Sequence, residues 1–156
     1  MHRSVEEAAP RRAGRARRRR RAPPRTNMFH DVYSGRLKLY GEEHESTIRA
    51  ALNYAASLGQ LQRFGEAKSL LRKTIPVAQR VLGVSNDTAL RMRWAYAGAI
   101  CNDTAATLDD LHEAVTTLED VERTARRVLG GAHPDVAVFE KSMQNARAAL
   151  AARETP

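Results

Sequence analysis

A chain of 156 residues with a formal net charge of +8 has room for one modest domain, and its basic character is confined to one end. Residues 1–27 hold ten of the 26 basic side chains and two of the 18 acidic ones, so the other 129 residues carry 16 of each sign. This balance restricts any nucleic-acid hypothesis to the N-terminal segment. No stretch approaches the roughly 20 apolar residues that span a bilayer, so we expect no membrane association.

The N-terminal segment, residues 1–27, is rich in arginine, alanine and proline and almost lacks large apolar side chains. Such a composition does not repay the entropy of folding, so we expect this tail to be disordered. Its arginine run fits a nuclear-localisation signal or a nucleic-acid tether. It fits a mitochondrial presequence poorly, because Glu6 and Glu7 are acidic. We favour a third interpretation, a solvated tail or an N-terminus produced by truncation or by an incorrect gene boundary.

Glycines mark an internal repeat in the rest of the chain. Each glycine ends an apolar stretch, and three residues further on stands a side chain that can cap the next helix. The glycines are Gly41, Gly83 and Gly130, and the capping residues are His44, Asn86 and His133. Successive glycines are 42 and 47 residues apart. We therefore expect helices that end at a left-handed glycine and begin again at a capped residue.

Each complete unit divides into two amphipathic helices joined by a polar turn, which predicts an antiparallel hairpin. Alanines at matching points would let the paired helices approach closely: Ala55 and Ala67 in the first unit, Ala97 and Ala114 in the second. We expect an all-α domain over residues 28–150. It divides into a half repeat (28–40), two repeats (41–83 and 84–130) and a terminal helix (131–150), followed by a C-terminal tail (151–156).

The residues at these boundaries resemble the 42-residue tetratricopeptide repeats of kinesin light chains. The resemblance rests on the segment from Gly41 to Ile48, on Asn53-Tyr54-Ala55, on the segment from Arg63 to Ala67, on Val81-Leu82-Gly83 and on residues 128–134. The second unit departs from the pattern at Asn86-Asp87 and at Ala95. The resemblance implies a short right-handed solenoid whose first helices line a concave peptide-binding groove. It does not extend to a whole light chain, because a long heptad coiled coil is missing.

The exposed face of the first helices is the predicted peptide-binding surface. Its candidate residues are Arg49, Asn53, Gln60, Arg91 and Trp94. Asn53 is the strongest candidate, because a carboxamide both donates to and accepts from a bound peptide backbone. Trp94 aligns with Leu52, so packing between neighbouring hairpins is an alternative role for its side chain.

No catalytic, metal-binding or cofactor-binding pattern emerges. His112-Glu113 lacks the second histidine four residues on that a zinc protease needs. Cys101 has no cationic neighbour in sequence to favour its thiolate, and a single cysteine fits a reducing compartment. We therefore expect a non-enzymatic scaffold or adaptor without cofactors, in the cytoplasm, or in the nucleus if the arginine run is a signal. The rival is a nucleic-acid-associated protein whose tail binds phosphates while its helices only dimerise.

The half repeat at 28–40 has no first helix to pack against. Its apolar stripe, Phe29, Val32, Tyr33, Leu37 and Leu39, is expected to form an exposed patch. Upstream repeats or a second copy of the chain would cover such a patch. The final helix is expected to close the other end, because polar side chains flank its apolar face: Glu140, Lys141, Gln144, Asn145 and Arg147.

Overall fold

The computed structural model describes residues 25–155, and this part of the chain forms six helices and no strand. They are α1 (Arg25–Tyr40), α2 (Glu45–Gln60), α3 (Phe64–Leu82), α4 (Asp87–Asn102), α5 (Leu108–Leu129) and α6 (Pro134–Glu154). The expected all-α class is therefore confirmed. The expected disorder of the tail concerns residues that lie largely outside the described part. Helix α1 begins at Arg25, three residues before the expected start.

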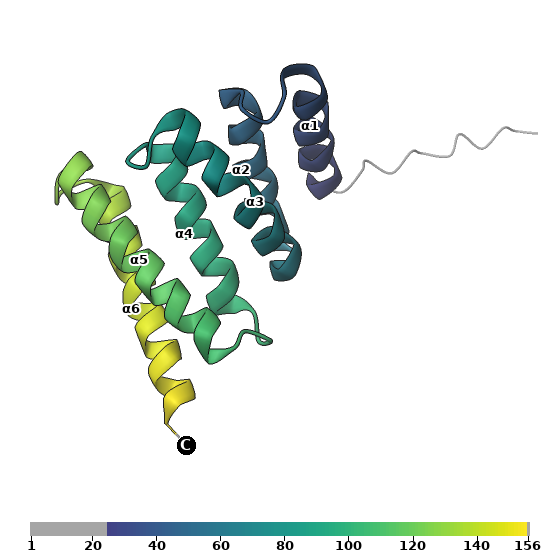
Figure 1. Cartoon of the computed structure of the whole chain (residues 1–156). Helices are drawn as coiled ribbons and strands as arrows, with labels where there is room; N and C mark the ends of the chain where they lie inside the picture. Colours follow the sequence, from purple (N-terminus) through teal and green to yellow (C-terminus); the bar gives the residue numbers. More distant parts are fainter. Residues whose placement is uncertain (1–24, 156) are drawn as a thin grey trace, which may run out of the picture.

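Consecutive helices run antiparallel and stack along one direction, with α1 and α6 at opposite ends (Figure 1). Helix α2 contacts α4, and α4 contacts α6, so the first helices of the hairpins form one layer. Within the described residues, the backbones of α1, α3 and α5 lie further apart and form the other layer, in which α3 and α5 meet through side chains such as Lys68 and Asp110. Because the first-helix layer is more closely spaced, the stack curves toward it, and α2, α4 and α6 line its concave side.

The three predicted capping residues all cap helices. The ring Nδ1 of His44 accepts a hydrogen bond from the Ser46 amide at 3.1 Å, and His133 does the same for the Asp135 amide at 3.1 Å. The Asn86 carboxamide oxygen accepts from the Thr88 amide at 2.8 Å. Each bond satisfies an amide that the first turn of a helix leaves without a partner. The sequence thus located the starts of α2, α4 and α6 correctly.

The glycines end their helices in a different way from the one expected. Gly41, Gly83 and Gly130 have positive φ angles of 81°, 97° and 87°. At Gly83 and Gly130, however, ψ is 150°, which is extended and not the predicted left-handed helical conformation. This region of backbone conformation is open essentially only to glycine. The Gly83 amide still donates to the Gln79 carbonyl at 3.0 Å, so the glycine closes α3 and redirects the chain in one step.

Small side chains form the centre of the core, as predicted. Ala55, Ala67, Ala97 and Ala114 are at most 2% exposed, and their burial fits the close helix approach expected within each hairpin. The apolar face of α5 is not buried over its whole length, because Leu108 and Val128 are 43% and 49% exposed. These residues lie at the termini of the longest helix, beyond the helices that cover its middle.

Helix α6 continues to Glu154, four residues beyond the expected end of the terminal helix. Its last turns are tied to the loop before α5, because the Arg153 guanidinium donates to the Ala106 carbonyl at 2.5 Å. This contact joins residues 47 apart in the chain, so helical spacing alone did not reveal it.

Candidate protein-interaction site

A groove of about 500 Å³ lies between α1 and α2. We call it the α1–α2 groove and define it by its lining residues, Met28, Phe29, Val32, Asn53, Ala56, Ser57 and Gln60. Helix α1 supplies three large apolar side chains, and α2 supplies carboxamides at Asn53 and Gln60 beside the small Ala56. No lining residue is charged. Such a mixture suits an apolar ligand surface whose backbone or side chains also offer hydrogen bonds.

The repeat register explains why this groove is open. Phe29 of α1 is equivalent to Leu71 of α3 and Leu118 of α5, because each stands 12 residues before its glycine. Leu71 and Leu118 are 0% and 1% exposed, whereas Phe29 is 37% exposed. In the two complete hairpins a first helix covers this position. The corresponding helix is missing from the described residues in front of α1.

Val32 shows the same difference one turn later. It is 46% exposed, while the equivalent Thr74 and Val121 are 8% and 0% exposed. The α1–α2 groove is therefore the position of a first helix, with the lining that such a helix requires but without the helix. The expectation of an exposed apolar patch is confirmed for Phe29, Val32, Leu37 and Leu39. It is wrong for Tyr33, which is 8% exposed and stacks on Tyr54 with ring centroids 6.1 Å apart.

Two of the five predicted binding residues, Asn53 and Gln60, line the α1–α2 groove. Arg49 lies one turn before Asn53 on the same helix, where its guanidinium pairs with Glu45 at 2.9 Å and remains largely exposed. These three residues share one face of α2 at helical spacing.

Arg91 and Trp94 lie on α4 and contact α6 instead of the groove. Arg91 pairs with Asp135 at 2.8 Å, and this hydrogen bond raises the pKa of its guanidinium. The Trp94 indole donates to the Ser142 hydroxyl at 2.8 Å and lies 6.0 Å from the Phe139 ring. Both side chains thus hold α4 to α6, which is the packing role that the alignment of Trp94 with Leu52 suggested.

The binding site predicted from the sequence did not include the apolar side of the α1–α2 groove. The sequence predicted Phe29 and Val32 to be uncovered, but it did not join them, or Met28, to Asn53 and Gln60. The alignment of the repeats could have shown this connection. Asn53 is equivalent to Ser142, and Ser142 is the residue that Trp94 of the preceding first helix reaches.

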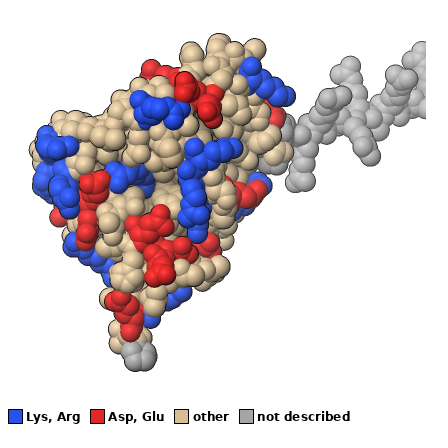
Figure 2. Space-filling model, in the orientation of Figure 1, with Lys and Arg blue, Asp and Glu red and all other residues tan. Residues whose placement is uncertain are grey.

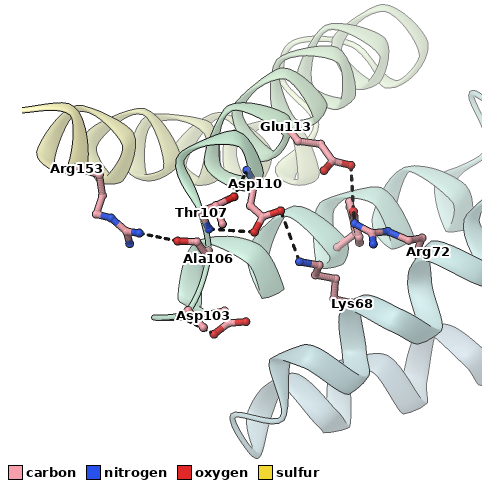
Figure 3. Close-up of polar contacts among 10 residues, drawn as sticks. Lys68, Arg72, Asp103, Ala106, Thr107, Asp110, Glu113 and Arg153 are labelled. Carbon is pink, nitrogen blue, oxygen red and sulfur yellow. Dashed lines mark hydrogen bonds and ion pairs between the residues drawn. The ribbon is translucent and has the colours of Figure 1, made fainter.

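A second polar cluster links α3, α4 and α5 (Figure 3). The Arg72 guanidinium donates to the Tyr96 hydroxyl at 2.9 Å, and that hydroxyl donates to a Glu113 carboxylate oxygen at 3.0 Å. Burial is the main cause that raises the pKa of Tyr96, so its phenol keeps its proton at neutral pH. These two bonds join α3, α4 and α5 through their side chains.

The start of α5 belongs to the same cluster. The Thr107 hydroxyl accepts from the Asp110 amide at 3.1 Å, and the Asp110 carboxylate accepts from the Thr107 amide at 3.0 Å. This reciprocal capping lowers the pKa of Asp110, chiefly through the bond from the Thr107 backbone, and Lys68 adds an ion pair at 3.6 Å.

The described residues do not form a catalytic or metal-binding arrangement. Burial raises the pKa of the Cys101 thiol, which disfavours the nucleophilic thiolate. His112 is exposed and pairs with Glu154 at 3.0 Å. Within residues 25–155 no three His, Cys, Asp or Glu side chains are placed to hold a metal ion. None of the six described helices is long and apolar enough to cross a membrane.

Charges of both signs are interspersed on the surface of the helical stack. Figure 2 shows lysines and arginines next to aspartates and glutamates across the visible face, without a broad region of one sign. Several of these side chains pair between helices, including Arg147 with Glu119 at 2.7 Å and Arg93 with Asp120 at 2.7 Å. This visible face therefore does not present the basic surface that nucleic-acid binding uses.

Residues 47–87 match the tetratricopeptide repeat family. This range begins in α2, contains all of α3 and ends at the first residue of α4, so it corresponds to the first complete hairpin. No curated protein matches the chain. The matched repeat and the stacked antiparallel hairpins together define an all-α array similar to tetratricopeptide repeats. Such arrays are, in general, scaffolds for protein–protein interaction and typically have no catalytic activity.

Proposed function

We propose that this protein is a non-catalytic scaffold or adaptor that binds a partner helix or peptide on its concave side, in the α1–α2 groove. The single observation that carries the proposal is the exposure of Phe29 and Val32 at positions that are buried in both complete hairpins. A large apolar side chain left in water costs free energy that a ligand recovers when it covers the residue.

The two filled grooves of the same chain indicate what the ligand resembles. Helix α2 packs on α3 and α4, and α4 packs on α5 and α6. The ligand would therefore be an amphipathic helix that runs antiparallel to α1. On α4 a bulky side chain, Trp94, reaches α6 at Ser142, so the ligand would place a bulky side chain opposite the equivalent Asn53. Arg49, Asn53 and Gln60 would line its polar side.

The repeat type and the cellular compartment are parts of the same proposal. The 42-residue spacing of Gly41 and Gly83, with His44 after the first glycine, favours the kinesin-light-chain type of repeat. We place the protein in the cytoplasm, and the arginine run makes the nucleus the alternative. A role in nucleic-acid binding would depend on the tail, which lies outside the described residues.

The test uses a helix that this fold already accommodates. A fluorescein-labelled peptide of residues 87–102, with Cys101→Ser, is titrated with the full chain at low protein concentration, and its anisotropy is recorded. We expect saturable binding that Val32→Asp abolishes. Val138→Asp is the matched control, because Val138 lies on α6 and is also 46% exposed. Binding that is equal in both variants, or an unsaturable signal, would refute the proposed site.

A further inference from the structure

Helix α1 carries a second apolar pattern that faces away from the core. Met28, Val32, Gly35 and Leu39 recur at spacings of four, three and four residues, which is the spacing of a coiled-coil seam. Met28, Val32 and Leu39 are 55%, 46% and 77% exposed, and a side-chain carbon built at Gly35 would meet nothing within 4 Å. We call these four residues the α1 seam. The seam is long enough to pack along a whole second helix.

The sequence of α1 argues against an ordinary first helix of the same repeat as the occupant. In α3 and α5, alanines stand at the buried positions where neighbouring helices approach closely. In α3 these residues are Ala67 and Ala78. The equivalent residues of α1 are Arg25 and Arg36. Arg36 is already engaged, because its guanidinium donates to the Ser46 hydroxyl at 3.0 Å. The approach that is open to a partner is therefore centred on the α1 seam, which lies further from α2.

The chain does not supply the occupant from its own N-terminal segment. Counted back by one repeat, α2 corresponds to residues 3–18. Where α2 has Ile48, Leu52 and Leu58, this segment has Glu6, Pro10 and Ala16, as read from the sequence. These residues lack the apolar face of a first helix.

The other end of the stack does not fit as the occupant either. Positions that are buried apolar residues in α2 and α4, such as Leu58 and Ile100, become polar in α6, where the equivalent residue is Arg147. Arg147 is exposed and pairs with Glu119 of α5 at 2.7 Å. Helix α6 is thus a polar cap, and a head-to-tail stack of copies would place this cap on the apolar seam.

We propose that the partner is a second copy of this chain, whose α1 packs antiparallel against α1 across a two-fold axis. This inference rests on the proposed function, because it names the molecule whose helix covers the exposed side of α1, and it centres that helix on the α1 seam. In the antiparallel register Met28 of one copy meets Leu39 of the other, and Val32 meets Gly35. The absence of a side chain at Gly35 allows the two helices to approach closely where they cross.

Charge complementarity supports this register. Asp31 and Lys38 stand one residue before Val32 and Leu39, so both lie on the same edge of the α1 seam, seven residues apart. Antiparallel packing places Asp31 of each copy beside Lys38 of the other, and the two-fold axis forms this pair twice. The Asp31 side chain is 78% exposed in the single chain and, among the described residues, pairs only with the neighbouring His30, at 3.3 Å.

Sedimentation of the full chain over a range of concentrations tests the inference. We expect a species of twice 17.3 kDa that dissociates on dilution. Asp31→Lys and Lys38→Asp should each weaken dimerisation by about tenfold or more, because each replaces two attractive pairs by two repulsive ones. The double variant with both changes should restore the dimer, which a merely structural role of either residue does not predict. Val32→Asp should give a monomer, and Val138→Asp should not.

The outcomes separate this inference from the proposed function. A chain that stays monomeric at every concentration, yet binds the peptide of residues 87–102, overturns the dimer and leaves the groove as a site for another helix. A dimer that survives Val32→Asp and both charge reversals uses another surface, which also overturns the inference. A folded monomer without peptide binding refutes both proposals, and the circular dichroism of each variant establishes that it is folded.

Discussion

Alanine substitution at one equivalent position of α1, α3 and α5 tests whether the first-helix position in front of α1 is vacant. Phe29, Leu71 and Leu118 are equivalent, but only Phe29 lacks a covering first helix. Leu118→Ala removes a side chain that is 1% exposed and leaves a cavity, so it should destabilise the protein by about 2–5 kcal/mol. Leu71→Ala, at 0% exposed, should cost about the same.

Phe29→Ala should cost much less, although phenylalanine is the larger residue. Full burial of such a side chain is worth about 1.5–3 kcal/mol, and Phe29 is 37% exposed, so roughly 1–2 kcal/mol is at stake. No closed cavity forms, because the position already opens into the α1–α2 groove. A fully buried phenylalanine would instead cost about 3–5 kcal/mol.

Urea unfolding followed by far-ultraviolet circular dichroism measures these differences by linear extrapolation. The protein must be dilute enough to be monomeric, because dimerisation would add the free energy of association to the apparent stability. Leu71→Ala and Leu118→Ala serve as each other's control. If Phe29→Ala were as costly as Leu118→Ala in the monomer, the position would be covered, and the argument for a vacant first-helix position would fail.

Four further predictions concern other parts of the molecule. Ala114→Leu should destabilise the fold by roughly 1–3 kcal/mol in the same assay, because the position is 0% exposed and a larger side chain would separate α5 from α4; a neutral result would contradict the hairpin packing. Thr107→Ala should cost about 1 kcal/mol by removing a cap. Capping lowers the pKa of Asp110 in the folded state, so its carboxylate stabilises the fold above the ordinary pKa of about 4. This stabilisation is lost as the pH falls through the lowered pKa. Asp110→Asn should therefore make the free energy of unfolding depend less on pH in the acid range. Deletion of residues 1–24 should leave the melting temperature and the helical signal of the remaining chain unchanged, and any DNA binding that it removes should weaken with salt by a log–log slope of about −0.9 per phosphate.

The sequence by itself determined where α2, α4 and α6 begin and where α1, α3 and α5 end. Chain-local chemistry sets these boundaries, since a capping side chain such as Asn86 bonds an amide two residues away. The backbone conformation at one helix end nevertheless depended on the tertiary structure. Gly83 was predicted to be left-handed but is extended with a positive φ, because the direction of the next helix fixes ψ and the local sequence only requires glycine.

The site depended on contacts between residues far apart in the chain, and only the tertiary structure decided it. Trp94 and Asn53 both occupied the predicted binding face, yet Trp94 is bonded to Ser142, 48 residues away, while Asn53 faces an open groove. Phe29 and Leu118 stand at equivalent repeat positions and are both strongly apolar, so the sequence alone predicts the same burial for both. They differ because burial is a property of the covering helix, and α1, at the end of the stack, has none among the described residues.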